Sequence, residues 1–219
     1  MPSLGNIIEQ VKEVVYIVDD DYRVRESLSA LLRAYGKNVV LFASGQEFLQ
    51  YQRMDDCACL LLDLSLPSMN GLEVQQQAMS CAALPIIFIT GRGDVPSTVQ
   101  AMKGGAIDFL TKPLDEVSLL AAIDAALAKG RLLRAEQNEQ AQLRSLYMTL
   151  TPREQQVLCL LANGMLNKQA AGQLGITEYT VQVHRGHIMK KLHAKSFAAL
   201  VKLASKLPTD LVSSPNNNT

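Results

Sequence analysis

Five short apolar runs, separated by stretches with helical periodicity, dominate the first 128 residues. They cover residues 14–18, 39–42, 59–62, 86–89 and 106–110. Runs that are apolar almost throughout are typical of strands buried on both faces of a sheet. Parallel strands are joined by right-handed helical crossovers, which place helices on both faces of the sheet. The alternation therefore predicts a doubly wound α/β domain with a five-stranded parallel sheet.

Helix signals fill the segments between these runs. One helical face after the first run collects Val24, Leu28, Leu31, Leu32 and Tyr35. Gly36 can end that helix, and Ser44 with Glu47 forms the capping-box pattern that opens the next one. Asp115 is expected to cap a further helix through an alanine-rich stretch to residue 128.

The composition fits a globular chain of two domains. Its 219 residues are 48% hydrophobic and 19% charged, which suits two domains of ~100 residues each. No apolar run approaches the ~20 residues of a membrane span, and no secretion signal opens the sequence, so the cytoplasm is the expected compartment. The cysteines show no paired spacing and are expected to be reduced, buried thiols: Cys57, Cys59, Cys81 and Cys159.

Charge is segregated along the chain although the net charge is zero. Residues 1–128 hold 9 basic and 16 acidic side chains, whereas residues 149–207 hold 8 basic and 2 acidic ones. An acidic half joined to a basic half indicates two functions, the basic half facing a polyanion. A solvated charged face is the plainer alternative, which charge by itself leaves open.

The second half has its own organisation. Residues 129–148 are rich in Gln, Arg and Glu and predict a polar helical linker, whose pairing with a second copy stays open. Thr151, Pro152 and Glu154 then form a strong helix start. Further helices are expected over 167–174, 177–192 and 196–207, with a tight turn between the first two. The predicted parts are an extension 1–13, the α/β domain 14–128, the linker 129–148, an all-α four-helix helix-turn-helix domain 149–207 and a disordered tail 208–219.

Acidic, hydroxyl and basic side chains stand where predicted strands end. Asp19 and Asp20 follow the first strand, Asp63 follows the third, Thr90 ends the fourth and Lys112 follows the fifth. An α/β sheet presents its site beyond the carboxyl ends of its strands. Carboxylates gathered there repel one another, and a hard divalent cation with oxygen ligands relieves the repulsion. Mg²⁺ is therefore the expected ion.

One of these carboxylates can act as a nucleophile toward a phosphoryl group. Mg²⁺, an ammonium and a hydroxyl would stabilise the transferred charge. Asp63 is the candidate because it stands alone at the central strand. Each feature also has a structural explanation: Asp19 to Asp21 can cap a helix, Lys112 can be a surface lysine and Thr90 a turn residue. The combination is more specific than its parts.

Several motifs resemble, in order and approximate spacing, the receiver domain of two-component response regulators over residues 14–128. They are Val18-Asp19-Asp20-Asp21, Leu62-Asp63-Leu64-Ser65-Leu66-Pro67, Asn70-Gly71, Ile89-Thr90-Gly91 and Phe109-Leu110-Thr111-Lys112-Pro113. The resemblance implies the strand order 2-1-3-4-5, for which chemotaxis receivers are a known example. It also implies a cis peptide bond before Pro113.

The same resemblance implies roles for single residues. Asp63 would accept phosphate from a sensor histidine kinase. The implied Mg²⁺ ligands are Asp19, Asp20, Asp63 and the backbone carbonyl of Ser65. Thr90 and Lys112 would contact the phosphate, and Phe109 would be the aromatic switch residue that repacks when Thr90 moves.

The basic half has the pattern of a helix-turn-helix, which lays its second helix in the major groove of DNA. Val181, Ile188 and Leu192 give that helix a stripe facing the core. Another side, available to DNA, carries Gln182, Val183, Gly186 and Lys190. Positive charge for the phosphates comes from Lys168, Arg185, Lys190, Lys191 and Lys195. A small helical bundle with an ordinary basic surface is the alternative.

Residues 149–205 also resemble the LuxR-type DNA-binding domain. The motifs include Leu150-Thr151-Pro152-Arg153-Glu154, Asn167-Lys168, Leu174-Gly175-Ile176, Thr180-Val181, His184 and Lys191-Leu192. The resemblance adds Asn167 and Thr180 to the DNA-contacting residues and implies a dimer surface with Phe197, Leu200 and Val201. Gln182, Gly186 and His187 depart from the usual residues, which bears on the target sequence and leaves the domain assignment intact.

The whole chain thus resembles FixJ/NarL-type response regulators. The expected function is a phosphorylation-controlled transcription regulator that binds double-stranded DNA, works with RNA polymerase and forms a homodimer when phosphorylated or DNA-bound. An alternative is a regulator that binds DNA without phosphorylation and uses its receiver only to dimerise. An enzyme, such as a phosphatase with Asp63 as nucleophile, is not expected, because position 65 is Ser where a second carboxylate would stand.

Overall fold

The computed structural model describes residues 13–52, 57–81, 84–91, 93 and 95–208. The chain forms two compact units, Met1–Arg134 and Ala135–Thr219. The predicted extension and the predicted tail fall almost wholly outside the described residues.

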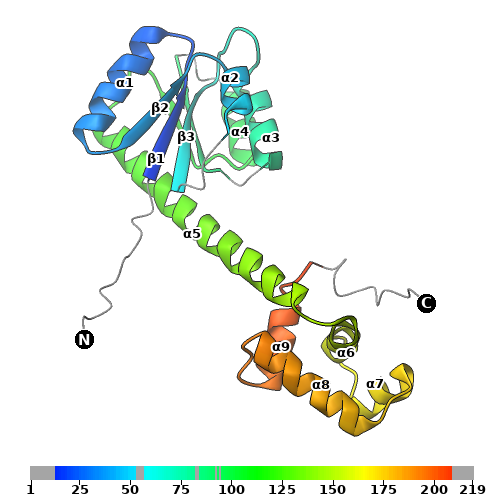
Figure 1. Cartoon of the computed structure of the whole chain (residues 1–219). Coiled ribbons are helices and arrows are strands. Elements are labelled where there is room, and N and C mark those ends of the chain that lie inside the picture. The colour runs from blue at the N-terminus through cyan, green and yellow to red at the C-terminus, as the bar shows by residue number, and fades with distance from the viewer. Residues whose placement is uncertain (1–12, 53–56, 82–83, 92, 94, 209–219) are drawn as a thin grey trace, which may run out of the picture. The chain divides into compact units, whose positions relative to one another are not determined.

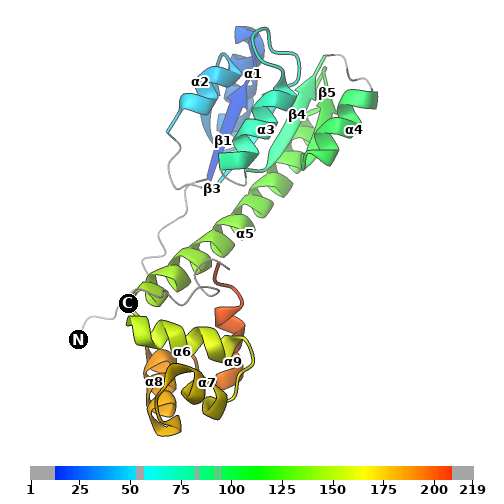
Figure 2. The ribbon, with the colours of Figure 1, turned by 90° about the vertical axis from the view of Figure 1, so that its right-hand side faces the viewer.

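The first unit is a five-stranded parallel sheet in the order β2-β1-β3-β4-β5 (Figures 1 and 2). The strands are β1 (Glu13–Val18), β2 (Asn38–Phe42), β3 (Cys57–Asp63), β4 (Ile86–Thr90) and β5 (Asp108–Thr111). The helices between them are α1 (Tyr22–Ala34), α2 (Gly45–Gln50), α3 (Gly71–Cys81) and α4 (Val95–Lys103), followed by α5 (Glu116–Met148). The predicted fold class and strand order are confirmed.

Helices cover both faces of the sheet and make two separate cores (Figures 1 and 2). On one face α2, α3 and α4 contribute Phe48, Val74 and Ala101 to the buried cluster. On the other face α1 and α5 contribute Leu32 and Ile123. The period of two along each strand divides its side chains between these cores.

The position of a strand in the sheet decides how deeply it is buried. β3 and β4 are buried along their whole length, and β1 is buried apart from its first residue. β2 and β5 are partly exposed, because they lie at the two edges. Burial on both faces, which the apolar runs predict for all five strands, is therefore wrong for these two.

The predicted helix starts and stops are confirmed in their main features. The Asp21 carboxylate accepts from the backbone N–H of Arg23 and caps α1, and Gly36 follows the end of that helix with φ +72°. Ser44 caps α2, and Asp115 accepts from the backbone N–H of Ser118 at the start of α5. The helix expected to reach residue 128 and the predicted helical linker are one continuous helix, α5.

The second unit contains α6 (Pro152–Ala162), α7 (Asn167–Leu174), α8 (Glu178–Lys191) and α9 (Phe197–Ala204). Thr151 and Glu154 form the predicted capping box at the start of α6. Leu143 and Tyr147, from the last turns of α5, lie in the same core as Val181 and Leu200. The end of the predicted linker is therefore part of the core of the second unit.

Three cysteines are free and buried: Cys57, Cys59 and Cys159. The side chain of Cys81 lies outside what the structure describes. Burial raises the pKa of the Cys57 and Cys159 thiols, so both groups are protonated at neutral pH. Among the described residues, no helix is long and apolar enough to cross a membrane.

Candidate functional site

Three aspartates meet at the carboxyl ends of two neighbouring strands. β1 ends at Val18, so Asp19 and Asp20 follow it directly, and Asp63 is the last residue of β3. One carboxylate oxygen from each of the three lies within 4.8 Å of the others. Asp19 is fully buried, Asp63 is 6% exposed and Asp20 is exposed. The strand order therefore brings together the carboxylates that the sequence places 44 positions apart.

Lys112 joins this cluster from the loop after β5. Its ammonium lies 2.7 Å from Asp19 Oδ2 and 3.1 Å from Asp63 Oδ2. Burial by itself would lower the pKa of Lys112, but its hydrogen bonds and ion pairs with both carboxylates outweigh burial and raise that pKa. The lysine is therefore charged at neutral pH. The peptide bond between Lys112 and Pro113 is cis, as predicted.

Burial controls the protonation of Asp19. Desolvation raises the pKa of this carboxyl, and the negative charge of Asp63 acts in the same direction. The ammonium of Lys112 and the backbone N–H of Asp21 offset only part of the increase. A divalent cation would add the positive charge that this partly compensated site lacks.

The donor set suits a hard divalent ion. Asp19, Asp20 and Asp63 supply carboxylate oxygens, the ligand type that Mg²⁺ prefers. Asp20 is exposed, which leaves space for the water ligands that Mg²⁺ keeps. The backbone N–H of Ser65 donates to Asp63 Oδ1 at 3.2 Å, which fixes the loop after β3 next to the carboxylate. The role of the Ser65 carbonyl as a ligand stays a prediction.

Arg25 supports the aspartate pair, and the sequence analysis missed it. Its Nη1 donates to the backbone carbonyls of Asp19 and Asp20 at 2.7 and 3.0 Å. These bonds fix the backbone that carries two of the three carboxylates. The signal in the sequence is an arginine one helical turn inside α1, four residues after the cap Asp21.

Gly71 packs against the backbone that carries Asp63. A Cβ atom at this position would lie 2.5 Å from the Asp63 carbonyl oxygen and 2.9 Å from Leu64 Cα. The backbone N–H of Gly71 donates to the Leu64 carbonyl at 3.0 Å, and Asn70 Oδ1 accepts from the N–H of Leu72. The Asn70-Gly71 motif therefore closes the loop behind Asp63.

Thr90 and Phe109, the two predicted switch residues, lie on the neighbouring strands β4 and β5. Thr90 is fully buried at the end of β4, and its carbonyl accepts from the backbone N–H of Lys112 at 2.7 Å. Phe109, on β5, is partly buried, with its ring centroid 6.2 Å from that of Phe88. A movement of Thr90 would therefore displace both the loop that carries Lys112 and the edge strand β5.

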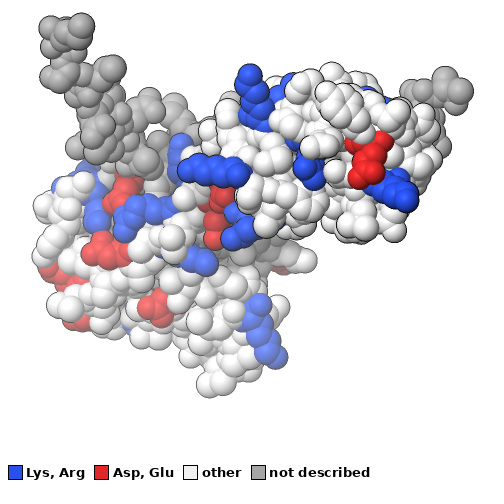
Figure 3. Space-filling model, turned by 90° about the horizontal axis from the view of Figure 1, so that it is seen from below, with Lys and Arg blue, Asp and Glu red and all other residues white. Residues whose placement is uncertain are grey.

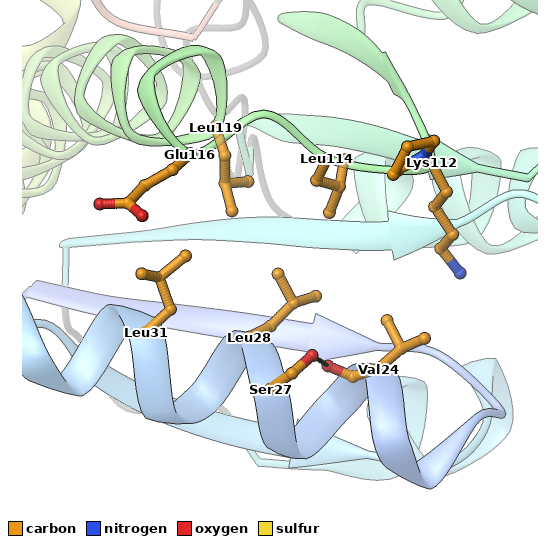
Figure 4. A pocket seen from close by; sticks show the side chains of 9 residues that line it. Val24, Ser27, Leu28, Leu31, Lys112, Leu114, Glu116 and Leu119 are labelled. Carbon is orange, nitrogen blue, oxygen red and sulfur yellow. Dashed lines mark hydrogen bonds between the residues drawn. The ribbon is translucent and has the colours of Figure 1, made fainter.

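A hollow of about 370 Å³ lies between α1 and the β5–α5 loop (Figure 4). Val24, Leu28 and Leu31 line its α1 side, and Leu114 and Leu119 face them. Beside it, the Tyr35 hydroxyl donates to Glu116 Oε1 at 2.5 Å and the Lys37 ammonium binds Asp124 at 2.7 Å. These two contacts join the segment that follows α1 to α5, and the lining of the hollow extends to Lys112.

In the second unit, α7, a turn at Gly175 and α8 form the predicted helix-turn-helix. Val181 and Ile188 are fully buried, so one side of α8 faces the core. Gln182, Val183, Gly186 and Lys190 are exposed on α8, as predicted. On the face drawn in Figure 3, basic and acidic side chains lie interspersed.

Some of the residues predicted to contact DNA also have partners within the unit. Arg185 Nη1 donates to Asn167 Oδ1 at 3.4 Å, and its guanidinium lies 5.7 Å from the centroid of the Phe197 ring. The Thr180 hydroxyl lies 2.8 Å from that of Thr177. The Lys191 ammonium lies 2.7 Å from Glu154 Oε2.

The remaining residues predicted to contact DNA are exposed, whereas those predicted to form the dimer surface are only partly so. Lys168 and Lys190 are exposed. Phe197 is 41% exposed and Val201 is partly exposed, whereas Leu200 is fully buried in the unit's own core. Leu200 can therefore support a pairing surface only by packing underneath its exposed residues, without contacting a second copy.

The comparisons with known proteins agree with these two units. Residues 15–124 match the model of the response regulator receiver domain, and residues 148–204 match that of the bacterial regulatory proteins of the luxR family. Nodulation protein W of Bradyrhizobium diazoefficiens is 47% identical over 204 residues, which cover 93% of this chain and 90% of that protein. The response regulator protein TodT of Pseudomonas putida is 45% identical over 199 residues, which cover 90% and 88%.

Two solved structures match the chain over both units. The response regulator StyR is 49% identical and has a TM-score of 0.74, with 89% of this chain and 99% of that chain covered. Full-length FixJ from B. japonicum is 34% identical, with a TM-score of 0.52 and coverage of 90% and 98%. The fold and site define a phosphorylation-controlled regulator with its own DNA-binding domain. The chain belongs to the two-component response regulators that join a receiver domain to a LuxR-type domain.

Proposed function

We propose that Asp63 is the phosphoryl acceptor of this regulator and that a phosphohistidine of a sensor histidine kinase is the donor. The observation that carries the proposal is the position of Asp63, which shares the ammonium of Lys112 with the buried Asp19. A carboxylate held beside a fixed cation, at the open end of the sheet, can attack phosphorus while its charge is balanced.

The transfer balances as a simple displacement. A carboxylate oxygen of Asp63 forms a bond to phosphorus, and the phosphorus–nitrogen bond of the phosphohistidine breaks. The electron pair goes to the imidazole nitrogen, which leaves as a neutral ring once it is protonated. The product is an acyl phosphate on Asp63, and its hydrolysis by water would reset the regulator without making the chain a dedicated enzyme.

Mg²⁺ would be held by Asp19, Asp20, Asp63 and the backbone carbonyl of Ser65. Its chemistry here would be to neutralise phosphoryl oxygens and to orient them toward the acceptor. Arg25 keeps the backbone of Asp19 and Asp20 in place, which preserves the spacing of two of these ligands.

Lys112 and Thr90 would contact the phosphoryl group on Asp63. The ammonium of Lys112 binds two carboxylates in this structure and would bind a phosphoryl oxygen after transfer. The hydroxyl of Thr90 would turn toward the same group, and Phe109 would repack behind it. Phosphate would thus shift the population toward a second receiver conformation.

The LuxR-type domain would then bind double-stranded DNA as a homodimer and act on transcription with RNA polymerase. α8 would enter the major groove with Gln182, Val183 and Gly186 toward the bases. Phosphates would be bound by Lys168, Arg185, Lys190 and Lys191, with Asn167 and Thr180 nearby. Pairing would use the surface around Phe197 and Val201.

The test is intact mass and sedimentation of the full chain with Mg²⁺ and acetyl phosphate. The wild-type protein is expected to gain one phosphoryl group and to dimerise, and Asp63→Ala is expected to do neither. Asp124→Ala is the matched control, because Asp124 is exposed on α5, outside the site. A wild-type protein that gains no phosphoryl group from acetyl phosphate or from any kinase, yet binds DNA, would support phosphorylation-independent binding.

A further inference from the structure

The two ends of α4 are held differently. Thr90 ends β4, and α4 begins at Val95, so a short connection links the site to the first turn of the helix. Val95 is 76% exposed, whereas Ala101, near the other end of α4, is fully buried. A displacement of Thr90 therefore reaches the exposed end of α4 first.

The last turn of α4 closes on the carbonyl of Ala101. The backbone N–H of Ala106 donates to this carbonyl at 3.1 Å, and that of Gly105 donates to the Met102 carbonyl at 3.0 Å. Gly105 has a φ of +89°, in the left-handed region. This pair of bonds is a Schellman motif, which ends a helix in a defined conformation.

Gln75 adds a bond from α3 to the same turn. It is 4% exposed, and its Nε2 donates to the Ala101 carbonyl at 3.0 Å. An amide is costly to bury unless it is hydrogen-bonded, whereas an apolar side chain fills such a position without that requirement. The bond is directional, so Gln75 holds this turn in one place relative to α3.

Gly104 leaves the space that the amide occupies. The three nearest neighbours of a Cβ atom at this position would all be amide atoms of Gln75: Oε1 at 2.5 Å, Cδ at 2.9 Å and Nε2 at 3.0 Å. Gly104 is outside the left-handed region, so its backbone accepts alanine without strain. A Gly104→Ala substitution therefore acts on the Gln75 amide and leaves the backbone conformation allowed.

We propose that Gln75 is a positioning residue for the phosphorylation switch. It fixes the C-terminal turn of α4 to α3, so that α4 responds to phosphorylation at its N-terminal end and pivots about the turn at Ala101. Gln75 acts through Ala101 and contacts neither the acceptor nor the phosphate. The inference rests on the proposed phosphorylation of Asp63.

Hydrogen exchange of the full chain, with and without Mg²⁺ and acetyl phosphate, tests this role. In the wild-type protein, phosphorylation is expected to change exchange in the first turn of α4 and to leave the backbone N–H groups of Gly105 and Ala106 unchanged. In Gln75→Leu and in Gly104→Ala, the turn is no longer held to α3, so phosphorylation is expected to change exchange at Gly105 and Ala106 as strongly as in the first turn of α4. Gln76→Leu, an exposed neighbour on α3, is the matched control and should behave as wild type.

A merely structural role would predict faster exchange that is the same with and without phosphate. The double variant Gln75→Leu with Gly104→Ala is a further test. Both substitutions remove the same hydrogen bond, from Gln75 to the Ala101 carbonyl, so their effects on exchange should not add. The inference is overturned if Gly105 and Ala106 respond to phosphate in the wild-type protein as strongly as the first turn, or if either variant matches wild type. Intact mass is measured on each sample: a wild-type protein without a phosphoryl gain contradicts the proposed function itself, and a gain without the expected exchange pattern contradicts only the role of Gln75.

Discussion

The ammonium of Lys191 lies 2.7 Å from Glu154 Oε2 and 3.1 Å from the backbone carbonyl of Thr149. The same carboxylate oxygen accepts from the backbone N–H of Thr151. One buried carboxylate therefore joins the end of α8 to the segment between α5 and α6. Lys191, which is also predicted to contact DNA phosphates, makes both of these contacts within the unit.

Replacing Glu154 should destabilise the second unit. Glu154→Ala removes the capping carboxylate and the charged partner of Lys191, which should lower the free energy of unfolding by about 1–3 kcal/mol. Urea unfolding of the full chain followed by circular dichroism measures this change. Glu178→Gln is the control, since Glu178 is exposed on α8, and it should shift the free energy by less than ~0.5 kcal/mol. Equal effects of the two variants would contradict the assignment.

The Glu154 carboxylate should also make the free energy of unfolding of the second unit depend on pH in the acidic range. Burial raises the pKa of Glu154, but hydrogen bonds from Lys191 and Thr151 outweigh it and hold that pKa below its usual 4.5. The stabilisation is therefore complete above the unfolded-state pKa and is lost as pH falls through the lower folded-state pKa. Lys191 and His187 are the basic groups that face this carboxylate.

Urea unfolding from about pH 6 to about pH 3 tests this acid dependence. The stability of the second unit should fall more steeply in the wild-type protein than in Glu154→Gln, whose amide does not titrate. Parallel curves for the two proteins would show that other carboxylates cause the loss.

Arg25→Ala should weaken divalent-ion binding without removing a ligand. The variant removes the hydrogen bonds to the backbone carbonyls of Asp19 and Asp20, so the distance between their two carboxylates is no longer fixed. Mg²⁺ affinity, measured by calorimetry, is expected to fall by about tenfold, as for loss of other supporting contacts around metal ligands. Arg23→Ala, on the exposed surface of the same helix, is the control and should retain wild-type affinity. Unchanged affinity in Arg25→Ala would show that the ligands are held by other contacts.

Gly71→Ala should reduce both stability and phosphorylation. The added Cβ would push against the backbone of Asp63 and Leu64, at an overpacking penalty of about 1–3 kcal/mol. The rate of phosphoryl gain, followed by intact mass, should fall because the acceptor moves. Gly172→Ala meets no neighbour within 4 Å and should leave that rate unchanged while slightly stabilising α7. A wild-type rate in Gly71→Ala would mean that the loop accommodates the methyl group.

Exposed residues of α8 should divide into those that bind phosphates and those that read bases. Lys190→Ala is expected to weaken binding to all sequences and to lower the salt slope by about one. Gln182→Ala should weaken binding to the specific DNA site by about 1–3 kcal/mol and leave the salt dependence of the affinity unchanged. Fluorescence anisotropy at several salt concentrations measures both effects. If Gln182→Ala changed the salt slope and not the sequence preference, Gln182 would be placed at the phosphates.

The sequence was most informative where local rules and tertiary structure agree. Short runs that are apolar almost throughout located all five strands, and acids at the carboxyl ends of the strands located Asp19 and Asp63. The capping pattern at Thr151 and Glu154 was correct, because a cap depends on only a few neighbouring residues.

The remaining features depend on long-range contacts that no local pattern contains. Burial of β2 and β5 was overestimated, since only the strand order makes them edges. Arg25 was missed because its partners are backbone carbonyls, which carry no residue type. The bond from Gln75 to Ala101 was hidden for the same reason.

Helix α5 has a consequence for how this chain can be divided. Leu119 and Leu127 complete the core of the first unit, and Leu143 and Tyr147 complete that of the second. A fragment that begins at residue 149, where the helix-turn-helix motifs begin, would lack two side chains that its core encloses. We therefore expect a stable DNA-binding fragment to begin within the helix, near residue 135, and an exchange of receivers between such regulators should make its junction there.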